Sequence, residues 1–197
     1  MLFIKFTIGD MEKYQDFRKV YEHMIMTREP GFEFEEEEAL HSDWDSTSNS
    51  EVYEDISTSL LATKHPEEER RWFALIPDYA QKYLASYLGY DMSRAGALSF
   101  SMLGILNYLE FSMEVEMNNL QIIKNLTGLV EFSALAYPYG GMERFLMVMK
   151  AFDLIPIECF NGFTVYEFDW VSEFTHEAID LPEATRRYKQ DRDYLFL

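Results

Sequence analysis

The chain has few of the features that mark secreted, membrane or disulfide-stabilised proteins. It contains a single cysteine, Cys159, among 197 residues, so no internal disulfide can form. Its longest uncharged apolar stretch, residues 95–109, is shorter than the about 20 residues that a membrane-spanning helix needs. The opening residues MLFIKFTIGD have no basic leader and no small-residue cleavage site, which argues against a signal peptide. These absences predict a cytoplasmic protein.

Basic residues are also scarce. Lys and Arg total 17 against 35 Asp and Glu, which gives a formal net charge of −18. Such a surface repels nucleic acid and anionic membranes, so neither is expected as a partner, whereas a basic protein or a metal cation is compatible. The charge is uneven, because residues 29–69 hold fourteen acidic residues against one base, Lys64.

Catalytic signatures are absent as well. The chain has no Gly-x-Ser-x-Gly elbow, no His-Glu-x-x-His pair and no Cys-x-x-Cys pair. Cys159 lies within a largely apolar predicted strand beside Phe160, and no histidine is near it in sequence, which favours a buried structural thiol over a nucleophile. Carboxylates are too numerous for any two to be singled out as a catalytic pair. The sequence therefore assigns no catalytic residue.

What the sequence does contain is enough apolar and aromatic material for one substantial core. Hydrophobic residues make up 48% and aromatic residues 16% of the chain. We predict a single α+β domain over residues 1–197, with an antiparallel sheet of about four to six strands and helices packed mainly on one face. Its parts are an acidic loop near 40–52, a helical middle at 66–106, a strand–helix–hairpin half at 109–170 and a C-terminal helix at 180–196.

In the first half, residues 2–8 alternate as a strand does, and Gly9-Asp10 supplies a turn and a helix N-cap. A helix follows and ends before Pro30-Gly31, and residues 32–38 read as an edge strand with outward glutamates. A second helix begins at Pro66, and Pro77 is expected to kink or split it. The inward residues predicted for the first helix are Tyr14, Phe17, Tyr21, Met24 and Ile25. Gly89 is expected just past the end of the second, and residues 93–106 read as a further helix.

In the second half, residues 109–117 alternate strictly and predict a half-buried strand with Glu110 outward. Residues 128–138 form the next predicted strand. A turn at 138–141 leads into a helix whose inward residues are Met142, Phe145, Leu146, Met149 and Phe152. Asn161-Gly162 predicts a hairpin with a type I′ turn. The last helix is expected to have Asp180 near its N-cap and Pro182 in its first turn.

The stretch HSDWDSTSNSEVYEDI, residues 41–56, resembles a calcium loop in the spacing of its oxygen ligands. Two features count against this, because Ser48 stands where that loop needs glycine and no second copy occurs in the chain. A solvated acidic loop is the favoured interpretation, with calcium as the one candidate cofactor. A transition metal on His41 is a weaker alternative. The candidate ligands are Asp43, Asp45, Thr47, Asn49, Glu51 and Glu54.

The stretch YPYGGMERF, residues 137–145, is the other candidate site. Gly140 and Gly141 precede a helix start and could offer backbone N–H groups to an anion. The spacing fits neither a dinucleotide fingerprint nor a phosphate loop, so a tight strand-to-helix turn is favoured.

Three functions fit these observations. The first is an acidic binding protein, of the inhibitor or immunity type, that captures a basic protein through residues 29–69. The second is an enzyme or small-ligand domain with scattered site residues near Gly140-Gly141, and the third is a subunit of a larger assembly. We expect the first, with no resident cofactor required. Its predicted contact residues are Glu35, Glu36, Glu37, Glu38, Asp43, Trp44, Asp45 and Tyr53.

Overall fold

The computed structural model describes residues 1–34, 66–95, 102–134, 142–191 and 195. Within them lies a six-stranded antiparallel sheet in the order β2-β3-β1-β4-β5-β6, against which six α-helices pack. The predicted α+β class is therefore confirmed, with a strand count inside the expected range. The strands are β1 (Leu2–Ile8), β2 (Glu116–Lys124), β3 (Thr127–Ser133), β4 (Leu154–Phe160), β5 (Val165–Trp170) and β6 (His176–Asp180).

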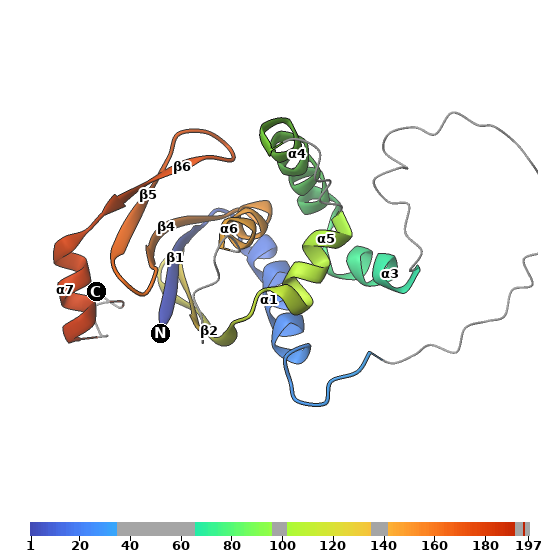
Figure 1. Ribbon diagram of the computed structural model, residues 1–197, viewed down its shortest axis with the longest axis horizontal. Helices are drawn as coiled ribbons and strands as arrows, with labels where there is room; N and C mark the ends of the chain where they lie inside the picture. Colours follow the sequence, from blue (N-terminus) through green and yellow to red (C-terminus); the bar gives the residue numbers. More distant parts are fainter. Residues whose placement is uncertain (35–65, 96–101, 135–141, 192–194, 196–197) are drawn as a thin grey trace, which may run out of the picture.

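Most helices lie on one face of the sheet, as predicted. In Figure 1, α7 lies on one side of the sheet, and α1, α4, α5 and α6 lie on the other. Side-chain contacts agree, since Phe6 of β1 packs on Tyr14 of α1 while Phe3 packs on Tyr188 of α7. The helices are α1 (Met11–Met26), α3 (Pro66–Leu75), α4 (Asp78–Ala95), α5 (Met102–Asn107), α6 (Met142–Ala151) and α7 (Pro182–Gln190), with a π-helix, η1 (Tyr108–Ser112).

The first strand and helix form where the sequence predicts them. Asp10 has extended backbone angles, and its carboxylate accepts hydrogen bonds from the backbone N–H groups of Glu12 and Lys13, which caps α1. The buried side of α1 contains four of the five residues expected there, whereas Ile25 is exposed. That correction matters below, because Ile25 lines a pocket.

Most of the core lies between the sheet and this helix layer, and a smaller part, with Phe3 and Tyr188, lies under α7. All five inward residues predicted for α6 are buried. Phe17 of α1 contacts both Phe145 and Phe152, and Phe145 contacts Phe132 of β3, so aromatic rings connect the two helices to the sheet.

Pro77 splits the middle helical region, as predicted, because α3 ends at Leu75 and α4 begins at Asp78. The prediction that Gly89 follows the helix end is wrong, since α4 continues to Ala95. A single glycine in an exposed helix position lowers helix propensity without breaking the helix. The helix expected over 93–106 is present as the end of α4 and as α5, and residues 96–101 lie outside the described part.

The strand predicted over residues 109–117 is wrong for most of its length. Residues 108–112 form η1, in which the Met113 N–H donates to the Tyr108 carbonyl, and β2 begins only at Glu116. The predicted burial is reversed only at two positions, since the Glu110 side chain is 2% exposed and Phe111 is 53% exposed. The physical reason is a set of distant polar partners that holds Glu110 inside, as described below. The other residues predicted to face inward, Leu109, Met113, Val115 and Met117, are buried.

The predicted hairpin is confirmed, but its turn is not type I′. The strands pair at Phe160 and Val165, so the loop holds four residues. The Asn161 side-chain oxygen accepts hydrogen bonds from the N–H groups of Phe163 and Thr164, and Gly162 alone in the loop has positive φ, at 97°. The asparagine side chain thus closes a wider turn than the Asn-Gly pair alone predicts.

Two further predictions need correction near the chain ends. The C-terminal helix was expected to reach residue 196, but α7 ends at Gln190, because Asp191 has extended backbone angles. Its N-cap is Leu181, one residue beyond Asp180, and Pro182 lies in the first turn as expected. Of the edge strand expected over 32–38, residues 32–34 are not in a strand and the others lie outside the described residues. Strand β6 was not predicted from the sequence.

Candidate functional site

Every candidate site residue predicted from the sequence lies outside the described residues. The structure therefore leaves the calcium loop, the glycine pair and the acidic contact segment as predictions. These residues are Glu35, Glu36, Glu37, Glu38, Asp43, Trp44, Asp45, Thr47, Asn49, Glu51, Tyr53, Glu54, Gly140 and Gly141. The described part of the chain contains two other candidate surfaces, a pocket and an acidic patch. Neither was predicted from the sequence.

The pocket lies between the end of α1, η1 and the neighbouring ends of β2 and β3, and has a volume of about 860 Å³. We call it the Arg28 pocket. Met113, Val115 and Met117 line it and are buried, while Ile25 and Phe111 line it and stay partly exposed. Its lining is therefore mainly apolar, which is typical of cavities that bind small molecules.

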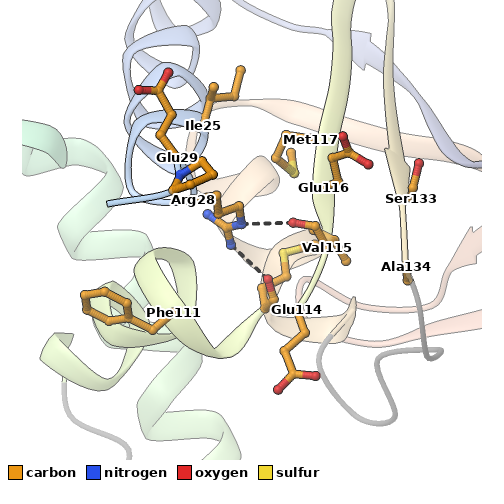
Figure 2. Close-up of a pocket in the computed structure, with 12 residues that line it drawn as sticks. Ile25, Arg28, Glu29, Phe111, Glu114, Val115, Glu116, Met117, Ser133 and Ala134 are labelled. Atoms are coloured by element: carbon orange, nitrogen blue, oxygen red, sulfur yellow. Dashed lines mark hydrogen bonds between the residues drawn. The ribbon is translucent and has the colours of Figure 1, made fainter. Parts of the chain in front are cut away.

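Arg28 forms part of the pocket wall (Figure 2). Its Nε donates to the Val115 carbonyl at 3.0 Å, one Nη donates to the Met24 carbonyl at 2.6 Å, and the other donates to the Met113 carbonyl at 2.9 Å. Burial lowers the pKa of the Arg28 guanidinium from its ordinary value. Arg28 thus joins α1 to the segment before β2 and holds the pocket in shape.

Carboxylates surround this pocket. Glu29, Glu114 and Glu116 all line it and are exposed, and Figure 2 shows them on different sides of Arg28. Three carboxylates against one guanidinium make the mouth of the pocket acidic, so its field favours a cation over an anion.

The carboxylate of Glu110, the residue before Phe111, is buried and bonded to two residues that are distant in the sequence. The Glu110 Oε1 lies 2.8 Å from His23 Nε2 and accepts a hydrogen bond from Arg71 Nε at 3.0 Å, while Oε2 accepts from an Arg71 Nη at 3.3 Å. Burial raises the pKa of Glu110, but the hydrogen bonds from His23 and Arg71 outweigh it and leave that pKa below its ordinary value. Glu110 therefore stays ionised at neutral pH, which is unsuited to a general acid.

Aromatic rings connect this ion cluster to the pocket. The Arg71 guanidinium lies 3.8 Å from the centre of the Phe34 ring, and Phe34 packs edge-to-face on Phe111 at 6.0 Å. The Arg71 guanidinium thus forms a cation–π contact with Phe34, and Phe34 in turn packs on Phe111, which lines the pocket.

Two other unusual groups have structural explanations. Cys159 is buried, as predicted, and burial raises the pKa of its thiol to about 12, which disfavours the thiolate that a nucleophile needs. The Lys150 ammonium donates to the Glu173 carbonyl and lies 3.6 Å from the centre of the Trp170 ring, and burial lowers the pKa of Lys150. Lys150 thus connects α6 to the end of β5 and the residues after it.

The acidic patch lies on the α7 side of the sheet. Register places Glu158 directly opposite Glu167 across β4 and β5, and Asp169 directly opposite Glu177 across β5 and β6. Alternation along β5 puts Glu167 and Asp169 on one face, so all four carboxylates share it. We call these four residues the sheet carboxylates.

Asp169 and Glu177 form a cross-strand pair of like charge, an arrangement that costs stability, whereas Glu158 has Glu167 on one side and Lys5 of β1 on the other. Glu167, Asp169 and Glu177 are exposed, and none of the three forms an ion pair with a base within the described part of the chain. The alternation in VYEFDW marks Glu167 and Asp169 as outward in the sequence. Their cross-strand neighbours follow only from the strand register, so the sequence alone did not predict the patch.

Similarity to known proteins, metal-binding geometry and membrane-spanning character give this chain no functional assignment. No protein-family model, curated protein or solved structure matches this chain. Across the described residues, no group of three or more His, Cys, Asp or Glu side chains is placed to hold a metal ion. No helix in that part of the chain combines the length and apolar character needed to cross a membrane.

Proposed function

We propose that this chain is an acidic binding protein that captures a basic protein partner. The sheet carboxylates carry the proposal, because Asp169 and Glu177 stand directly opposite each other and Glu167 lies exposed on the same sheet face. The pair of Asp169 and Glu177 costs stability in the free protein. Positive charges of a partner would remove that cost on binding, which adds to the affinity.

The charge of the whole chain supports the same function. A net charge of −18 attracts a basic protein over distances near the Debye length, about 10 Å at 0.1 M salt. Association should therefore be fast at low salt and slow steeply as salt is added. Inhibitor or immunity-type activity against a basic enzyme in the cytoplasm is the specific form of this function that we favour.

The acidic segment 29–69 belongs to the same proposal. Its described acids include Glu29, Glu33 and Glu67, all of which are exposed. Of the contact residues proposed from the sequence, Glu35–Glu38, Asp43 and Asp45 would add negative charge, and Trp44 and Tyr53 would add apolar anchors.

The proposal is tested by capture followed by measured binding. The tagged protein is incubated with a lysate of its own host at low salt, washed, and eluted with rising salt. We expect a stoichiometric basic partner that leaves with salt. The purified partner is then titrated against wild type and a variant with Glu167→Gln, Asp169→Asn and Glu177→Gln, whose affinity should fall at least tenfold at low salt.

A matched variant controls for net charge. Glu12→Gln, Glu22→Gln and Asp78→Asn remove the same three charges from exposed helix positions. This control should bind within about twofold of wild type if the sheet face is the contact. Equal losses in the two variants, or recovery of no basic protein, would contradict the proposal.

A further inference from the structure

The Arg28 pocket has a size and lining that the proposed function does not use. Its volume of about 860 Å³ lies within the range of small-molecule sites, roughly 300–1,000 Å³. Two of its lining residues, Ile25 and Phe111, leave 37% and 53% of their surface exposed, so a ligand there would cover apolar surface now in water.

The thioether side chains in the pocket suit a ligand of irregular shape. Met113 and Met117 both line the cavity, and methionine adapts its conformation and is polarisable. Phe111 adds an aromatic ring, and its neighbour Phe34 already packs against the Arg71 guanidinium. A ligand with an apolar body and a positive group would find both kinds of contact here.

The charges decide against an anion. Arg28 is the cation of the pocket lining, and its Nε and both Nη atoms already donate to backbone carbonyls. Glu29, Glu114 and Glu116 remain exposed around the mouth. An anionic ligand would meet three carboxylates, whereas a cation would meet them favourably at the solvent end of the cavity.

We propose that the Arg28 pocket binds a small organic cation in which an amine or guanidinium group is joined to an apolar body. The apolar body packs on Met113, Val115 and Met117, and the cationic group lies at the mouth near Glu114 and Glu116. This site is separate from the sheet carboxylates and does not depend on the basic protein partner.

The test uses three probes with one apolar body and three charges: 4-phenylbutylamine, 4-phenylbutanol and 4-phenylbutyrate. Each is titrated into the full chain labelled with ¹³C at the methionine methyl groups, and the shifts are followed by NMR. We expect the amine to shift Met113 and Met117, with an affinity at least tenfold above that of the butyrate and with the alcohol between them. Met147 and Met149, which are fully buried in the core, serve as internal controls.

Variants separate the apolar contact from the charge contact. Ala134→Trp should fill the cavity and abolish the amine shifts, whereas Ala178→Trp, at an exposed position on β6, should leave them intact. Glu114→Gln with Glu116→Gln should weaken the amine about fivefold and leave the alcohol unchanged. These two glutamates are exposed, so this variant tests the proposal even if Ala134→Trp fails to fold.

Three results would overturn the proposal. The first is the absence of amine-induced shifts at Met113 and Met117. The second is binding of the butyrate as tightly as the amine. The third is a shift of the Met113 and Met117 methyl groups by a basic peptide, such as Lys-Phe-Lys-Leu-Lys, under conditions where the amine shifts neither. That result would assign the pocket to a partner protein. Loss of the sheet-face interaction described above would leave all three readouts unchanged, so the two proposals fail independently.

Discussion

At the scale of single residues, Glu110 is the group whose environment departs furthest from the sequence pattern. It is buried, ionised, and bonded to His23 and Arg71. Removing the charge from one member of such a cluster leaves its partners desolvated without compensation. We expect Glu110→Gln to destabilise the fold by about 2–3 kcal/mol at pH 7, as measured by urea unfolding. Glu114→Gln, an exposed control, should change stability by less than about 0.5 kcal/mol.

The same carboxylate predicts a pH dependence. The pKa of Glu110 is lowered in the folded chain, so its contribution is fully present above the ordinary glutamate value of 4.5. That contribution is lost as pH falls below 4.5 and through the lowered pKa. The stability difference between wild type and Glu110→Gln should therefore shrink below pH 4.5 in unfolding curves recorded from pH 7 to pH 3. A difference that stays constant or grows on acidification would contradict the lowered pKa.

Glu110 also explains why the sequence predicts the wrong element at 109–117. Alternation of apolar and polar residues is evidence for a strand only if the polar residues face solvent. Here His23, 87 residues away, and Arg71, 39 residues away, satisfy Glu110 in the interior. Partners at such separations cannot be read from one sequence, whereas the Asp10 cap and the inward residues of α6 were predictable because their causes are local.

At the scale of elements, two glycines provide a matched pair. A Cβ on Gly128 of β3 would lie 2.3 Å from Cζ of Phe6, a ring that is fully buried. A Cβ on Gly89 of α4 would meet nothing within 4 Å. We expect Gly128→Ala to destabilise the fold by about 1–3 kcal/mol through overpacking, and Gly89→Ala to stabilise it by about 0.5–1 kcal/mol through helix propensity. Denaturant unfolding of the two variants checks this, and effects of the same sign would contradict the packing described.

The hairpin between β4 and β5 also shows how much of an element can be predicted from the sequence alone. The Asn161-Gly162 pair predicted where the chain turns. The turn type, however, depends on the Asn161 side chain, which accepts hydrogen bonds from the N–H groups of Phe163 and Thr164. Pairing between strands is even less accessible, because the cross-strand neighbours of the sheet carboxylates follow only from register. The fold class was therefore predictable from the sequence, and the acidic patch and the Arg28 pocket were not.

At the scale of the whole molecule, self-repulsion is the expected cost of a net charge of −18. Salt screens exposed charges, so the melting temperature should rise by several degrees between 10 and 300 mM NaCl. Asp169→Asn, which removes one like-charge pair, should raise the melting temperature by about 1–3 °C at 10 mM NaCl and have no effect at 500 mM. Scanning calorimetry checks both, and a gain that persists at high salt would contradict an electrostatic origin.

The most direct test of the proposed function is the association rate constant of the captured basic partner as a function of salt. Stopped-flow traces are recorded from 20 to 500 mM NaCl for wild type, the sheet-carboxylate variant and its charge-matched control. We expect the rate constant to fall steeply with salt for wild type and control, and to depend clearly less on salt for the sheet-carboxylate variant. Equal salt dependence in all three proteins would contradict the claim that this acidic sheet face captures the partner.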